Sequence, residues 1–174
     1  MQKPDEKQSL PDKAYRLGFN YEKQHGVCSQ SALRAIMDAL EGSTDPLLFR
    51  ALFGFVGGAG DSTRAMCGGL SAGIAAISQR FGRQLGDLGN ESQPDFTCNE
   101  LVRQLMGRYE EEFGSFICAD IQTRLMGQVF DFSDPSAWDT FLAAGGHEVK
   151  CPHVVGSAAR WTVEILQNKE RKKA

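Results

Sequence analysis

Apolar residues recur every three to four positions along most of this chain, and no segment of useful length alternates between apolar and polar residues. One such stripe contains Val102, Leu105, Met106, Tyr109 and Phe113. A spacing of 3.6 residues buries one face of a helix, whereas a spacing of two is typical of a strand. The pattern therefore predicts an all-α protein, a compact bundle of about six to eight helices.

Proline and glycine mark where these helices begin and end. Pro11 stands in the first turn of a helix that we expect to end near His25, as proline does at helix starts. A chain of 174 residues is the usual size of one domain. We expect a disordered N-terminus over residues 1–9, a single helical domain over 10–168 and a basic C-terminal tail over 169–174.

Charge and composition exclude several kinds of partner. The net charge is −3 and the isoelectric point about 5.6, which argues against nucleic acid because such proteins carry a basic face. The N-terminus lacks the apolar stretch of a signal peptide, and no apolar run reaches the length of a membrane span. We expect a cytoplasmic protein whose cysteines are reduced.

Seven glycines and one cysteine gather in "GFVGGAGDSTRAMCGGLSAGIAAIS", residues 54–78. No Lys-Ser or Lys-Thr follows them, so a phosphate-binding P-loop is not indicated. We expect a glycine-rich loop leading into a central helix that begins near Cys67. Gly68 and Gly69 leave its first turn bare, and either a cofactor, another sulfur or simply a neighbouring helix could approach there.

Four of the five cysteines, Cys28, Cys67, Cys118 and Cys151, stand at expected helix starts. Unpaired amides and the helix dipole lower the pKa of a thiol at such positions, so these residues are candidate nucleophiles and metal ligands. The alternative is that they fill the core, as free cysteines often do. No C-x-x-C pair is present, which argues against zinc ribbons, thioredoxin-type motifs and covalent haem.

Two histidines lie near these cysteines in sequence. His25 precedes Cys28 by three residues and His153 follows Cys151 by two. Histidine beside cysteine can activate a thiolate or bind metal, although a lone histidine is more often a partly exposed surface residue. His147 is expected to lie in a loop.

The four phrases that carry these cysteines resemble a known pattern. They are "VCSQSAL", the glycine-rich stretch that contains Cys67, "RYEEEFGSFICADI" and "KCPHVV". From about Tyr15 to Leu166 the chain resembles the redox-active protein family named for a C…GCAxxG…C…C pattern, and with it part of the split-Soret cytochromes. The resemblance implies that the four cysteines act together and leaves Cys98 outside the pattern.

The resemblance has local departures. Met66 stands where the family has glycine, and the small residues Gly69 and Ala72 follow the cysteine. The small-residue character of this helix start is kept. Because no C-x-x-C-H is present, the covalent haem of the cytochromes does not carry over.

Three functions remain open at this point. The four cysteines could cycle between dithiol and disulfide, or they could bind a metal or an iron–sulfur cluster as a four-thiolate set. The third possibility is a non-catalytic interaction module with core cysteines. We expect Cys28, Cys67, Cys118 and Cys151 to converge while Cys98 stands apart. We also expect a redox partner protein and, from bare helix faces and the apolar stretch "LLFRALFGFV", a homodimer.

Overall fold

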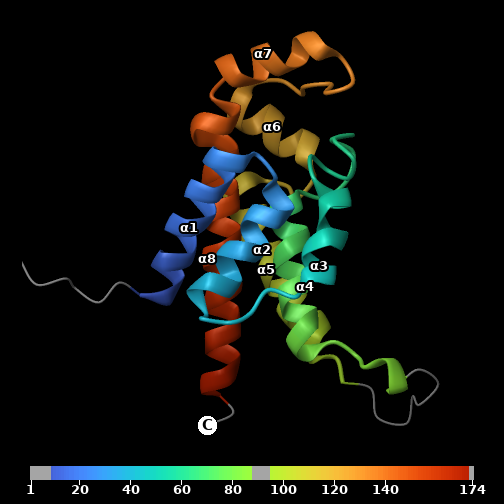
Figure 1. The fold of residues 1–174 in the computed structure, drawn as a ribbon, viewed down its shortest axis with the longest axis vertical. Coiled ribbons are helices and arrows are strands. Elements are labelled where there is room, and N and C mark those ends of the chain that lie inside the picture. Colours follow the sequence, from blue (N-terminus) through green and yellow to red (C-terminus); the bar gives the residue numbers. More distant parts are fainter. Residues whose placement is uncertain (1–8, 88–94, 173–174) are drawn as a thin grey trace, which may run out of the picture.

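The computed structural model describes residues 9–87 and 95–172, and within these ranges the chain forms α-helices and no strands. The all-α class predicted from the apolar spacing is confirmed, and Figure 1 shows the helices in order along the chain. The α-helices are α1 (Leu10–His25), α2 (Cys28–Ala39), α3 (Pro46–Ala51), α4 (Gly68–Phe81), α5 (Thr97–Phe113), α6 (Cys118–Met126), α7 (Pro135–Ala143) and α8 (Cys151–Arg171). Short 3-10 turns η1 (Leu52–Phe55) and η2 (Leu85–Asp87) and a π-helical turn η3 (Gly146–Lys150) complete the described elements.

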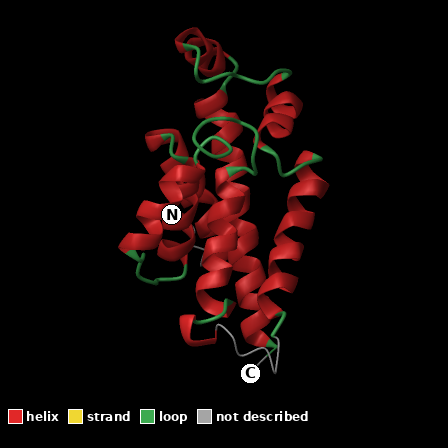
Figure 2. Cartoon of the chain, turned by 90° about the vertical axis from the view of Figure 1, so that its right-hand side faces the viewer, coloured by secondary structure: helices red, strands yellow, loops and turns green. Residues whose placement is uncertain are grey.

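Helices α4 and α8 occupy the centre of the bundle. One side of each packs with α1 and α2 around a core that includes Ala72 and Val155. The opposite side packs with α5 and α6 around a second core, which includes Leu70 and Ala158. Several of the helices run side by side along the long axis (Figure 2), whereas α7 lies across one end (Figure 1). The two central helices are therefore buried on both sides, and their first turns lie at the same end of the bundle (Figure 1).

Helices α1 and α8 cross at close range because each carries a glycine at the contact. A Cβ added at Gly18 would lie 3.0 Å from the Val155 carbonyl oxygen, and one added at Gly156 would lie 2.8 Å from the Tyr15 carbonyl oxygen. Real Cβ atoms essentially never approach as closely as 2.8 Å and rarely as closely as 3.0 Å, so a side chain at Gly156 above all would force the helices apart. This crossing fixes the end of α1 against the start of α8.

The helix boundaries agree with the local capping signals. Ser9 caps α1, and the side chains of Asp45 and Asp134 cap α3 and α7, as these residue types do at helix starts. Ser9 therefore belongs to the start of α1, and residues 1–8 of the expected disordered N-terminus lie outside the described residues.

The C-terminal end of the described chain is helical. The last helix, α8, continues to Arg171, so the beginning of the expected basic tail over 169–174 is helical; residues 173–174 lie outside the described part. Among the described residues no helix is both long enough and apolar enough to cross a lipid bilayer.

Candidate functional site

Four cysteines from four different helix starts line one cavity of about 290 Å³. Cys28, Cys118 and Cys151 are the first residues of α2, α6 and α8, and Cys67 immediately precedes α4. The sequence predicted that all four cysteines stand at helix starts. In the structure all four line the wall of the same cavity. Whether they act there as ligands or as redox thiols stays a prediction.

The glycine-rich loop before α4 reaches this cavity in a left-handed conformation. The backbone angle φ is positive at five consecutive residues, Gly57, Gly58, Ala59, Gly60 and Asp61. Glycine adopts this conformation without steric cost, whereas a side chain makes it unfavourable by roughly 1–2 kcal/mol per residue. The glycines thus permit a tight left-handed turn, which hydrogen bonds such as Thr63 N–H to the Gly57 carbonyl (2.8 Å) hold in place.

Two glycines give the cysteines the room that they occupy. A Cβ at Gly68 would lie 2.4 Å from the Cys28 sulfur, and a Cβ at Gly58 would lie 2.7 Å from the Cys118 Cβ. The bare first turn of α4 therefore receives another sulfur, one of the alternatives left open by the sequence. The loop and the helix start both serve the close approach of cysteines.

Burial, rather than the helix dipole, controls the protonation of these thiols. Cys28, Cys118 and Cys151 are half-buried and line the cavity. Loss of hydration raises the pKa of Cys28, Cys67 and Cys151, and it raises the pKa of Cys118 to about 12. The expectation that helix starts would lower the thiol pKa values is wrong, because desolvation outweighs the amides.

Donors from the protein act on three of the sulfurs. The Tyr109 hydroxyl donates to the Cys67 sulfur (3.8 Å), and the Gln122 amide donates to the Cys118 sulfur (3.7 Å). The Gly57 amide opposes the rise in the pKa of Cys28. The amides of Gly69 and Leu70 do the same for the pKa of Cys67, although no hydrogen bond of normal geometry caps α4 there. These donors stabilise negative charge on sulfur.

Cys151 differs from the other three in its backbone surroundings. The π-helical turn η3 runs directly into α8, and Lys150 already has helical angles. Cys151 is therefore not at a free helix N-terminus, contrary to the expectation from Pro152. Single π-helical turns are frequent at functional sites, and this one places His147 on the cavity wall.

Glu22, near the end of α1, is a site residue that the sequence did not reveal. Its side chain is 2% exposed and lines the cavity with the four cysteines. Burial raises the pKa of Glu22 to about 7, against an opposing contribution from Ser31. The buried carboxyl in turn raises the pKa values of Cys28 and Cys151.

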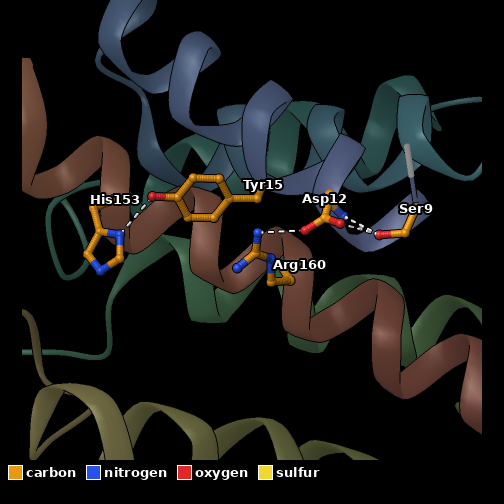
Figure 3. Close-up of polar contacts among 5 residues, drawn as sticks. All are labelled: Ser9, Asp12, Tyr15, His153 and Arg160. Atoms are coloured by element: carbon orange, nitrogen blue, oxygen red, sulfur yellow. Dashed lines mark hydrogen bonds and ion pairs between the residues drawn. The ribbon is translucent and has the colours of Figure 1, made fainter. Parts of the chain in front are cut away.

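The histidine on the cavity wall is His147, and neither His25 nor His153 lines the cavity. His153 instead shares a 2.8 Å hydrogen bond with the Tyr15 hydroxyl on α1 (Figure 3). In the same view Arg160 donates to Asp12 at 2.8 Å. Both contacts join α8 to α1, so they help to hold Glu22 beside the cysteines.

Cys98 lies apart from this group. It is in the first turn of α5, does not line the cavity, and has the Ser78 hydroxyl 3.5 Å from its sulfur. The separation predicted between Cys98 and the other four cysteine positions is present in the structure. It makes Cys98 a natural control for experiments on the site.

The sequence of this chain was compared with models of known protein families. The model of a family described as "Putative redox-active protein (C_GCAxxG_C_C)" matches residues 27–165. The chain belongs to this family. The match contains all four cavity cysteines, whereas Glu22 precedes it. No curated protein and no solved structure matches the chain.

The cavity of this C_GCAxxG_C_C protein carries four cysteine thiols, but they are not arranged around a point. No three His, Cys, Asp or Glu side chains in the described ranges are disposed to hold a metal ion. All five cysteines are free thiols. The four cavity thiols therefore surround a volume, and what they do depends on the occupant of that volume.

Proposed function

We propose that this C_GCAxxG_C_C protein is a redox protein whose Cys28, Cys67, Cys118 and Cys151 bind an iron–sulfur cluster. The observation that carries the proposal is that four thiols, one buried and three half-buried, line one cavity. Four cysteine thiolates are the common ligand set of such clusters. The cluster would supply one-electron transfer, and the chain would hold it and limit its contact with water.

The protonation of the thiols favours ligation over thiol–disulfide exchange. Exchange requires a thiolate that its partner can reach, and redox-sensing cysteines have low pKa values and solvent access. Here burial raises the pKa of each cavity thiol. A bound cation deprotonates a coordinating thiol outright, so burial does not oppose ligation in the same way.

The spread of the thiols favours a cluster over a single ion. A mononuclear zinc site needs four sulfurs about 2.3 Å from one ion, and no described group is arranged to hold an ion. A polynuclear cluster divides its cysteines among several iron atoms. Thiols that surround a cavity fit that division.

The donors at the sulfurs suit such a centre. Hydrogen bonds to ligating sulfurs raise the reduction potential of iron–sulfur clusters. Tyr109 donates to Cys67, and Gln122 donates to Cys118. Gln122 is itself held, because its side-chain oxygen accepts from the Phe130 amide at 3.0 Å. These residues would adjust the potential without being ligands.

The test is the visible spectrum and metal content of protein purified without oxygen, for the wild type, Cys67→Ser and Cys98→Ser. We expect a coloured wild type that contains iron and sulfide, a Cys67→Ser variant that loses most of both, and a Cys98→Ser variant that keeps them. A colourless wild type that gains no cluster from added iron and sulfide would contradict the proposal. Loss of thiols on mild oxidation of that protein would then support disulfide chemistry, and no loss would support the interaction module.

A further inference from the structure

One carboxyl oxygen of the buried Glu22 side chain has no hydrogen-bond partner in the described chain, although the Ser31 hydroxyl acts on this carboxyl and lowers its pKa. Its Oε1 atom lies 4.0 Å from His147 Nε2, and its Oε2 atom has no hydrogen-bond partner among the described residues. Buried polar atoms in proteins almost always have a partner. Because Glu22 lines the cavity, a molecule inside the cavity can provide the missing donor.

The cavity wall supplies no positive charge to this carboxyl. Glu22 and Asp61 both line it, and none of its described lining residues is lysine or arginine. His147 is the remaining titratable nitrogen on the wall, and burial lowers its pKa, which favours the neutral ring. When Glu22 is ionised, this wall carries negative charge with no compensating lysine or arginine among the described lining residues, so it attracts cations and repels anions.

The part of the wall near α7 is aromatic. Phe132, Trp138 and Phe141 line the cavity there. The ring centres of Trp138 and Phe141 lie 5.0 and 5.1 Å from that of His147. Aromatic faces attract ammonium groups as well as apolar carbon, and about 290 Å³ is close to the lower limit of typical small-molecule sites.

We propose that the cavity binds a small organic cation, an alkyl or aryl ammonium compound, whose charged group contacts Glu22 and whose apolar part contacts Phe132, Trp138 and Phe141. This site lies in the aromatic part of the cavity whose other wall carries the cysteines. It goes beyond the redox centre and does not depend on a cluster, because none of these contacts involves a cysteine. The ammonium group donates to the unsatisfied Glu22 oxygen and supplies the positive charge that the wall lacks.

The experiment uses three probes of the same shape and different charge on reduced, metal-free protein. Calorimetry measures the binding of phenethylamine, neutral phenethyl alcohol and the anion hydrocinnamate. We expect the amine to bind most tightly, the alcohol more weakly and the carboxylate not at all. Glu22→Gln should weaken amine binding by about tenfold or more, as expected for loss of a charged hydrogen-bond partner.

Matched variants keep this test decisive. Glu41→Gln, at a side chain that is 83% exposed, should bind the amine as the wild type does. Trp138→Ala should weaken the binding of both the amine and the alcohol, because it removes an apolar contact that both probes share. This variant still tests the site if Glu22→Gln fails to fold.

Absence of amine binding would overturn the inference, as would a carboxylate that binds as tightly as the amine. Unchanged amine binding in Glu22→Gln would overturn it too, and so would unchanged binding in Trp138→Ala. Iron content, measured separately, reports on the cluster, so the two proposals can fail independently.

Discussion

Glu22 shares the buried face of α1 with Ala14 and Gly18, at intervals of four residues. Because Ala14 and Gly18 are small, α1 packs closely against α8. This close packing removes the Glu22 carboxyl from contact with water. The same loss of water acts on the cysteines of the cavity. At this scale desolvation is larger than the helix dipole, and it keeps both the thiols and the carboxyl toward their protonated forms.

The raised pKa of Glu22 predicts a pH-dependent stability. The pKa is about 7 in the folded chain against 4.5 in the unfolded one, so folding favours the protonated carboxyl. Wild-type stability should therefore fall as the pH rises from about 4.5 to about 7. Glu22→Gln removes this loss, and we expect it to be more stable than the wild type near pH 8 by roughly 1–3 kcal/mol.

Urea unfolding of metal-free protein at pH values near 4 and 8 measures this difference. Glu41→Gln, on the surface, should follow the wild type at both values. A Glu22→Gln variant with the same pH dependence as the wild type would show that Glu22 does not titrate as described.

The residues of the site differ in how far the sequence reveals them. The four cysteines are visible because proline, glycine and capping residues mark the helix starts beside them. Glu22 has no such signal: in "NYEKQHG" it stands among polar residues and resembles a solvated position. Glu22 follows Ala14 and Gly18 at intervals of four residues, which places the three side chains on one face of α1. This spacing indicates that Glu22 is buried only once α8 is known to cover that face.

The elements that position the site are the left-handed loop before α4 and the first turn of α4. The sequence predicted the glycine requirement and the helix, but not the left-handed turn, because Ala59 and Asp61 adopt a conformation that such residues rarely take. It also missed the π-helical turn η3, whose stability depends on tertiary contacts rather than on a local signal.

Gly68→Ala tests the close approach at the start of α4. The new Cβ would lie 2.4 Å from the Cys28 sulfur and 3.0 Å from both the Phe55 oxygen and the Ser29 nitrogen. We expect a loss of about 1–3 kcal/mol in the free energy of unfolding, as for other overpacked sites, and weaker iron binding. Urea unfolding and iron analysis measure the two effects.

Gly107→Ala, within α5, is the matched control. Its added Cβ meets no atom within 4 Å, so we expect unchanged or slightly higher stability, by up to about 1 kcal/mol, because alanine is the better helix former. Equal destabilisation by both substitutions would mean that contact with Cys28 is not the cause.

The whole molecule presents an apolar surface on α3 and η1. No residue of α3 is buried, and Leu47 and Phe53 are 76% and 63% exposed. This is the stretch from which the sequence predicted a homodimer, and the prediction stands untested. Apolar groups exposed together often mark contact sites between proteins.

We expect light scattering to give the mass of a dimer, and Phe53→Asp to shift it toward the monomer. The matched control is Leu85→Asp, at another highly exposed leucine (86%), which should leave the mass unchanged. A monomer mass for the wild type over a wide range of concentration would contradict the homodimer.

The central claim is that the four cavity cysteines together hold a polynuclear iron–sulfur centre. The most direct measurement is the amount of iron and acid-labile sulfide per chain after purification without oxygen and reconstitution. We predict iron and sulfide in equal amounts, with more than one iron per chain, because clusters pair each iron with a sulfide. A reconstituted protein that contains a single metal ion per chain without sulfide, or no metal at all, would contradict the account.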